Sequence, residues 1–171
     1  MSAIDELLAN NADFAASRPD RHLDVEPSRH LAIVTCMDSR LDVFAALGLG
    51  DGEAHVLRNA GGVISDDVIR SLAISQRLLG TREVMLIHHT DCGMLTFSNR
   101  ELRAKVQEDL GQDTGEFDFL PFTDLEGSVR EDIEFLQATQ LLDPATVFRG
   151  FVYDVRSGRL TEVRQEVEAG G

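Results

Sequence analysis

The chain has 171 residues, of which 43% are hydrophobic, enough for one domain with a sizeable core. Its 16 Lys and Arg against 30 Asp and Glu give a formal net charge of -14, which would repel a phosphate backbone or an anionic membrane. We therefore expect neither nucleic acid nor a membrane as a partner. Residues 1–6 lack the basic start of a signal peptide, and no apolar run approaches spanning length. The sequence predicts a cytoplasmic protein.

The first predicted element is an amphipathic helix over residues 3–16. The connection that follows, residues 17–28, is polar and contains two prolines, so it cannot continue the helix. We expect residues 1–28 to form a helical arm of a single domain that spans residues 1–171, with an apolar stripe able to dock on a partner subunit. Four apolar residues at roughly helical spacing make up this stripe: Ile4, Leu7, Leu8 and Phe14.

Strands and helices alternate through the rest of the chain. A strand, helix, strand order indicates a right-handed parallel crossover. The fold class predicted is therefore α/β, with a central, mostly parallel sheet flanked by helices. The strands are expected over 31–35, 54–57, 83–89, 147–155 and 159–163, and the helices over 41–47, 65–80, 102–110 and 125–142.

Two of these strands end in chemically active side chains. The apolar run 31–35 is typical of a strand buried on both faces, and it leads directly to Cys36. The run 83–87 leads in the same way to His89 and Cys92. Sites in open α/β sheets form outside the carboxyl ends of the strands. We therefore expect the two thiols and the imidazole to meet.

Such a meeting would suit a metal ion. Two Cys and one His with an open fourth position form a catalytic zinc arrangement, whereas a structural site usually has four protein ligands. Two cysteines in a reducing compartment favour a metal or catalytic role over a disulfide. The alternative is that both are small buried hydrophobes, which their polar neighbours argue against. Strand alternation places His88 on the opposite face from His89, where we expect it to pack or to support the site.

Further polar groups lie close to these ligands in the sequence. Asp38 and Arg40 can pair, and a carboxylate held by an arginine stays ionised and can orient or deprotonate a water on a metal. On an open surface the same pair would mean little. The segment from Arg58 to Gly62 offers backbone N–H groups, so Gly61 and Gly62 are candidates for binding an oxygen of substrate or product. A glycine turn with Arg58 in a structural ion pair is an equally good interpretation.

These motifs resemble those of the β-class carbonic anhydrases. The family's C-x-D-x-R motif is similar to residues 36–40, and its H-x-x-C motif is similar to residues 89–92. The segment 58–62 between them is similar as well, and the likeness extends over about residues 30–97. Both motifs together at this separation are quite specific for the family.

The resemblance implies one Zn²⁺ per chain on Cys36, His89 and Cys92, with Asp38 and Arg40 as the catalytic dyad. It also implies a parallel sheet flanked by helices. A homodimer or tetramer is implied too, in which N-terminal helices embrace the partner and active sites lie near the subunit interface. Some members hold an inhibitory bicarbonate with Trp, Arg and Tyr. This chain has no Trp, so that pocket is not expected here.

The expected function is the reversible hydration of CO2 to bicarbonate and a proton. Hydrolysis of carbonyl sulfide (COS) or carbon disulfide (CS2) is the alternative, because a compact branch of the family that this chain resembles contains carbonyl sulfide hydrolases. Both reactions use the same zinc set, so the ligands cannot decide the substrate. A weaker alternative is a non-catalytic, zinc-stabilised module in which Asp38 closes the fourth position.

Overall fold

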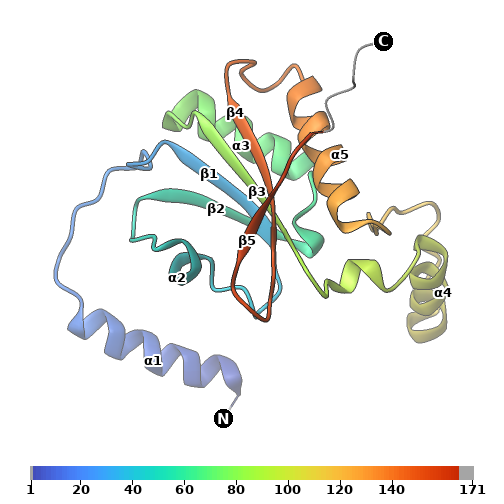
Figure 1. Cartoon of the computed structure of the whole chain (residues 1–171). Coiled ribbons are helices and arrows are strands. Elements are labelled where there is room, and N and C mark those ends of the chain that lie inside the picture. The colour runs from blue at the N-terminus through green and yellow to red at the C-terminus, as the bar shows by residue number, and fades with distance from the viewer. Residues whose placement is uncertain (1, 166–171) are drawn as a thin grey trace.

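The computed structural model describes residues 2–165, which fold around one five-stranded sheet (Figure 1). The strand order is β2-β1-β3-β4-β5. Neighbouring strands from β2 to β4 are parallel, and the edge strand β5 runs antiparallel to β4. The prediction of an α/β fold with a mostly parallel sheet is confirmed. The strands are β1 (Leu31–Cys36), β2 (Ala54–Asn59), β3 (Glu83–His89), β4 (Val147–Tyr153) and β5 (Leu160–Val163).

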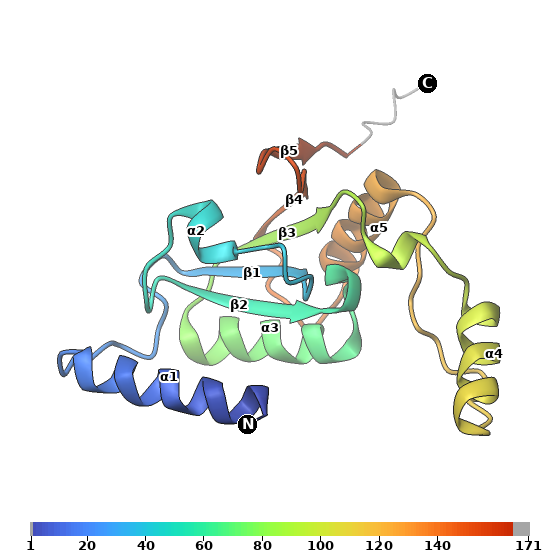
Figure 2. The same cartoon turned by 90° about the horizontal axis from the view of Figure 1, so that it is seen from below.

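Helices cover both faces of this sheet (Figure 2). The larger core lies between the sheet and helices α3 and α5, and includes Leu72 and Val129. A smaller core on the opposite face joins Ile33 and Ile87 of the sheet to Val43 of α2. The helices are α1 (Ala3–Ser17), α2 (Val43–Leu47), α3 (Asp66–Leu79), α4 (Asn99–Leu110) and α5 (Leu125–Ala138), with short 3-10 turns η1 (Ala60–Gly62) and η2 (Gly93–Leu95).

Strand β1 is buried on both faces, as its sequence predicts. Ala32 and Val34 belong to the core beneath α3 and α5, whereas Ile33 belongs to the core beneath α2. Thr35 is also fully buried, and its hydroxyl donates to the carbonyl of Ile87 at 2.8 Å. Thr35 and Ile87 are register partners, so β1 and β3 end at the same edge of the sheet.

Helix α1 lies apart from the sheet in both views (Figures 1 and 2). It begins where predicted, because Ser2 and Asp5 form a capping box at its N-terminus. None of its residues is buried. Within residues 2–165, no helix combines the length and the apolar character needed to cross a membrane.

Some boundaries differ from those predicted. Helix α4 begins at Asn99 instead of residue 102, because Ser98 and Glu101 form a capping box. Helix α5 ends at Ala138 instead of residue 142, because the next residue takes an extended conformation. Leu142 is nevertheless buried in the core, so its apolar side chain reflects packing of a loop and not continuation of the helix.

Candidate active site

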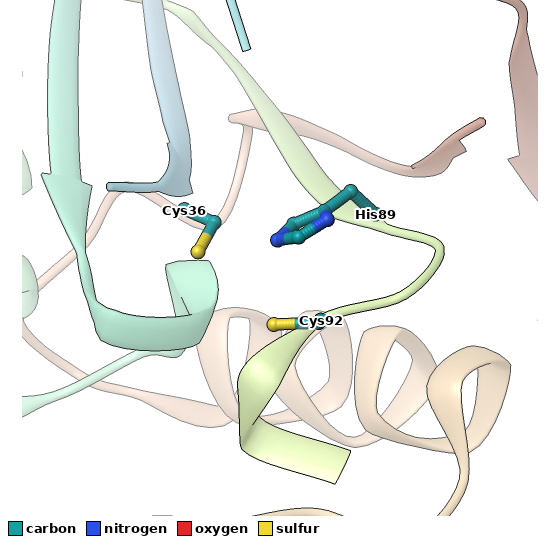
Figure 3. A group of neighbouring side chains, drawn as sticks. All are labelled: Cys36, His89 and Cys92. Carbon is teal, nitrogen blue, oxygen red and sulfur yellow. The ribbon is translucent and has the colours of Figure 1, made fainter. Parts of the chain in front are cut away.

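Three potential metal ligands meet at the edge of the sheet where β1 and β3 end (Figure 3). Cys36 is the last residue of β1, His89 is the last residue of β3, and Cys92 follows in the loop before η2. Their ligand atoms all lie within 4.8 Å of one another, and all three residues are buried. The structure therefore brings together the two thiols and the imidazole that the sequence placed at neighbouring strand ends.

The tautomer of His89 follows from its hydrogen bond. Its Nδ1 atom lies 2.8 Å from the carbonyl oxygen of Thr90, which can only accept, so Nδ1 carries the proton. In the neutral imidazole the lone pair is then on Nε2, which is buried without a hydrogen-bond partner among the described residues. Figure 3 shows the imidazole directed toward the two sulfur atoms. An orphaned nitrogen beside two thiols fits a metal ion, because a metal-bound His commonly uses one nitrogen for the metal and the other for a carbonyl.

The two thiols polarise each other. A hydrogen bond from Cys92 lowers the pKa of Cys36, against the opposing effect of burial. The same contact, together with burial, raises the pKa of Cys92. The backbone N–H of Gly61 also donates to the Cys36 sulfur at 3.3 Å. Because the thiolate is the form that binds metals, Cys36 is the thiol of this pair that is prepared to receive a cation.

Asp38 and Arg40 form the pair that their spacing predicts. Nε of Arg40 donates to Oδ1 of Asp38 at 3.0 Å, and Nη2 donates to Oδ2 at 2.7 Å. These hydrogen bonds hold the pKa of Asp38 well below its usual range. Oδ2 of Asp38 lies 3.7 Å from Nε2 of His89, so the carboxylate stands beside the ligand cluster while Arg40 holds it.

The segment 58–62 supports the end of β1. Arg58 donates from Nε to the carbonyl of Cys36 at 2.8 Å and from Nη2 to the carbonyl of Asp38 at 2.7 Å. Arg58 therefore has a structural role. Its partners are backbone carbonyl groups, whereas the predicted ion pair would have required a carboxylate. Gly61 and Gly62 are both buried. The N–H of Gly61 is directed at the Cys36 sulfur, and the contact of Gly61 and Gly62 with a substrate oxygen stays a prediction.

Comparison with known proteins decides the family. A carbonic anhydrase family profile matches residues 31–114. Beta-carbonic anhydrase 1 of Mycobacterium tuberculosis is 49% identical over 164 residues, which cover 95% of this chain and 99% of that protein. The chain belongs to the β-carbonic anhydrase family. Its likeness to the crystal structure of carbonic anhydrase from Streptococcus mutans has a TM-score of 0.93 at 50% identity, covering 96% of this chain and 99% of the other.

The family also contains more distant relatives with another activity. A carbon disulfide hydrolase of Saccharolobus solfataricus is 31% identical over 188 residues, which cover 96% of this chain and 90% of that protein. This identity is lower than the 49% shared with beta-carbonic anhydrase 1 of Mycobacterium tuberculosis.

Asp91 is a residue of this β-carbonic anhydrase site that was not predicted. It lies between two potential ligands, and its carboxylate accepts from Nη1 of Arg40 at 2.7 Å. Its carbonyl oxygen accepts from Nη2 of Arg40 at 2.9 Å. The sequence shows only that an acidic residue lies inside the H-x-x-C motif. It does not show that the partner of this residue is Arg40.

His88 packs behind the site, on the opposite side of β3 from His89. Its side chain is fully buried, with Nδ1 2.9 Å from the Ser128 hydroxyl and Nε2 3.2 Å from a carboxylate oxygen of Asp132. Its ring stacks on Phe122 at a centroid distance of 5.3 Å. Phe122 in turn packs against the cluster formed by Cys36, Cys92 and Met94. The packing role predicted for His88 is therefore the one observed.

Proposed function

We propose that this protein catalyses the reversible hydration of CO2 to bicarbonate and a proton, with one Zn²⁺ per chain on Cys36, His89 and Cys92. The observation that carries the proposal is the orphaned Nε2 of His89, which faces two thiols within 4.8 Å. Three protein ligands leave a fourth position for water, as catalytic zinc requires. Zinc bound there would supply the acidity that makes water nucleophilic at mild pH.

The chain's own residues would orient that water through a hydrogen bond. Oδ2 of Asp38 is the acceptor, because it lies toward Nε2 of His89 and is ionised well below neutral pH. Arg40 engages both oxygens of this carboxylate, which would keep them from binding the metal. Met94 and Phe122 supply an apolar wall next to the two cysteines, which suits a small, linear, apolar substrate.

For Gly61 and Gly62 we propose a supporting role at this site. The N–H of Gly61 stabilises the Cys36 thiolate, since a hydrogen bond to the charged form favours it. Gly62 lets the η1 turn approach the end of β1, because a Cβ at this position would collide with the backbone of Thr35 and Cys36. Direct contact of either N–H with substrate is the less favoured interpretation.

COS or CS2 hydrolysis remains the second candidate. It is favoured by the relationship to the Saccharolobus solfataricus carbon disulfide hydrolase and by the fact that both alternative substrates are also small, linear and apolar. A non-catalytic zinc module is disfavoured, because Arg40 holds both oxygens of Asp38 and a closed site would need that carboxylate on the metal.

Parallel assays on one preparation test these functions. Stopped-flow CO2 hydration is compared with sulfide release from COS and from CS2, alongside elemental analysis for zinc. We expect about one zinc per chain, rapid CO2 hydration, and little sulfide release. Faster turnover of COS or CS2 than of CO2 would replace the first proposal with the second.

Two serine variants tie the activity to the ligands. Cys36→Ser and Cys92→Ser should each lose zinc and activity together, because each removes a thiolate ligand. Full activity in either variant, or in metal-free wild type, would contradict the zinc assignment.

We also propose that the protein assembles as a homodimer or tetramer through α1. All residues of this helix are exposed, and its apolar stripe of Ile4, Leu7, Leu8 and Phe14 is from 54% to 70% accessible. Isolated helices of this length are marginal in water without packing partners. A second subunit would provide a surface on which the apolar stripe of α1 can pack, which the sheet of its own chain does not provide.

A further inference from the structure

We propose that Asp91 is a positioning residue: it clamps Arg40, and through Arg40 it keeps Asp38 off the metal position. This inference rests on the proposed function of the site and adds a residue to its machinery. The observation behind it is that Arg40 makes two hydrogen bonds to Asp91 in addition to the two that its side chain makes to Asp38.

The two carboxylates occupy different N–H groups of the guanidinium. Asp38 takes Nε and one N–H of Nη2, whereas Asp91 takes Nη1 and, through its carbonyl, the remaining N–H of Nη2. A guanidinium has five N–H groups in a fixed fork. The four bonds can therefore form together, and Asp91 does not compete with Asp38 for Arg40.

The clamp joins two parts of the chain that are far apart in sequence. Asp38 and Arg40 follow β1, and Asp91 lies 51 residues beyond Arg40, in the loop after β3. Arg40 is 44% exposed, and a long, exposed arginine gains considerable rotamer freedom when it is released. Fixing it from the β3 side removes that freedom, so Arg40 presents its fork to Asp38 in one orientation.

The backbone of Asp91 is shaped for this contact. Its φ of 57° lies in the left-handed region, which is uncommon for a residue other than glycine. Asp and Asn tolerate this conformation better than most residues. The turn brings both the side chain and the carbonyl of Asp91 onto Arg40, and it does so between two of the metal ligands.

Asp38 therefore has two possible arrangements, and the contact between Asp91 and Arg40 favours one of them. While Arg40 is clamped, both oxygens of Asp38 are engaged and the fourth metal position is open. When Arg40 is released, Asp38 can turn toward the ligands, because its Oδ2 is already 3.7 Å from Nε2 of His89. Loss of Asp91 should therefore increase the fraction of closed, inactive sites.

Two variants and a matched control test the clamp. Asp91→Gly removes the side chain and suits the left-handed backbone, and Asp91→Asn keeps the shape but removes the charge. Asp67→Asn is the control, because Asp67 also forms an exposed ion pair with an arginine, but on α3. Zinc content and thermal unfolding establish that each variant is loaded and folded.

The first readout does not depend on turnover. Azide binding to the cobalt-substituted protein, followed by visible absorbance, reports whether the fourth position is open. We expect azide affinity to fall about two- to fivefold in Asp91→Gly and less in Asp91→Asn, the range expected for an exposed ion pair, since the Asp91 side chain is 77% exposed. Asp67→Asn should bind azide like wild type. Equal azide affinity in Asp91→Gly and wild type would overturn the proposal.

The second readout separates positioning from substrate binding. In stopped-flow hydration, kcat should fall in proportion to the open fraction while KM stays close to that of wild type. In an Arg40→Ala background, Asp91→Gly should have no further effect, because its role passes through Arg40. An undiminished effect in that background would refute the clamp. If wild type did not hydrate CO2 at all, the proposed function would fail, whereas the azide measurement would still decide the role of Asp91.

Discussion

A Cβ atom on Gly62 would lie 2.8 Å from the backbone nitrogen of Cys36, closer than a side-chain carbon can approach. The φ of Gly62 is also 73°, in the left-handed region that favours glycine. The η1 turn is therefore pressed against the end of β1 at Cys36. Backbone contact at this point fixes where the Cys36 sulfur lies.

Gly62→Ala is therefore expected to damage both stability and the metal site. The left-handed backbone alone costs about 1 to 2 kcal/mol for a residue with a side chain, and the clash with β1 adds to that. Gly111→Ala is the matched control, because Gly111 has a φ of 65° but no atom within 4 Å of the place that a Cβ would occupy. Denaturant unfolding and zinc content measure the two effects. If both variants lost equal stability and kept their zinc, close packing at Gly62 would be unimportant.

The cluster of three potential metal ligands could be predicted from the sequence because its position depends on where two strands end. The apolar runs before Cys36 and His89 identify two buried strands, and parallel strands end at one edge of the sheet. The spacing of His89 and Cys92 then supplies two ligands from one strand and its loop. Nothing beyond local pattern and general topology was needed for the cluster in Figure 3.

The contacts around those ligands depend on geometry that the sequence does not show. Asp91 reaches Arg40 because of a left-handed turn, and such a turn at a non-glycine residue has no reliable sequence pattern. The N–H of Gly61 reaches the Cys36 sulfur because η1 lies directly against β1. The predicted end of α5 was also too late, because the apolar Leu142 packs into the core from a loop.

The packing of α5 on β4 gives a second test, this time of the fold. A Cβ on Gly150 of β4 would collide with Val129 of α5, so Gly150→Ala should cost about 1 to 3 kcal/mol through overpacking. Val129→Ala alone should also destabilise, because Val129 is fully buried. The double variant should lose less free energy of unfolding than the two single variants lose in total, by roughly 0.5 to 3 kcal/mol. Chemical unfolding of all four proteins measures this coupling, and strict additivity would mean that the two residues do not share one space.

The assembly through α1 is tested by charge on its apolar stripe. Leu7 and Leu8 are each 64% exposed, so a Leu7→Asp, Leu8→Asp variant should keep its fold but dissociate to monomers, as desolvating a carboxylate in an interface is unfavourable. Leu78→Asp on α3 is the control, because Leu78 is 72% exposed on a helix that already packs on its own sheet. Light scattering gives the mass of each protein. Wild-type monomers, or an unchanged oligomer in the double variant, would contradict this role for α1.

The charge state of Asp38 gives the last prediction. Side-chain and backbone hydrogen bonds from Arg40 hold the pKa of Asp38 well below its usual range, which is about 3.9 for an unperturbed Asp. A lowered folded-state pKa means that the pair contributes stability above the unfolded-state pKa, and that this contribution is lost as pH falls through the folded-state pKa. Asp38 is therefore expected to remain ionised through neutral and mildly alkaline pH.

Arg40→Gln should reverse this shift. The amide of Gln cannot supply the charged, two-pronged contact of Arg40, so the pKa of Asp38 should rise toward its ordinary value. Carbon-13 NMR of the Asp38 carboxyl, in metal-free wild type and variant, follows the titration directly. The same variant should retain zinc but lose most CO2 turnover, because the Asp38 carboxylate is then free to bind the metal. An Asp38 that titrates identically in both proteins would show that Arg40 does not set its charge, and an Arg40→Gln enzyme as fast as wild type would show that the pair does not keep the site open.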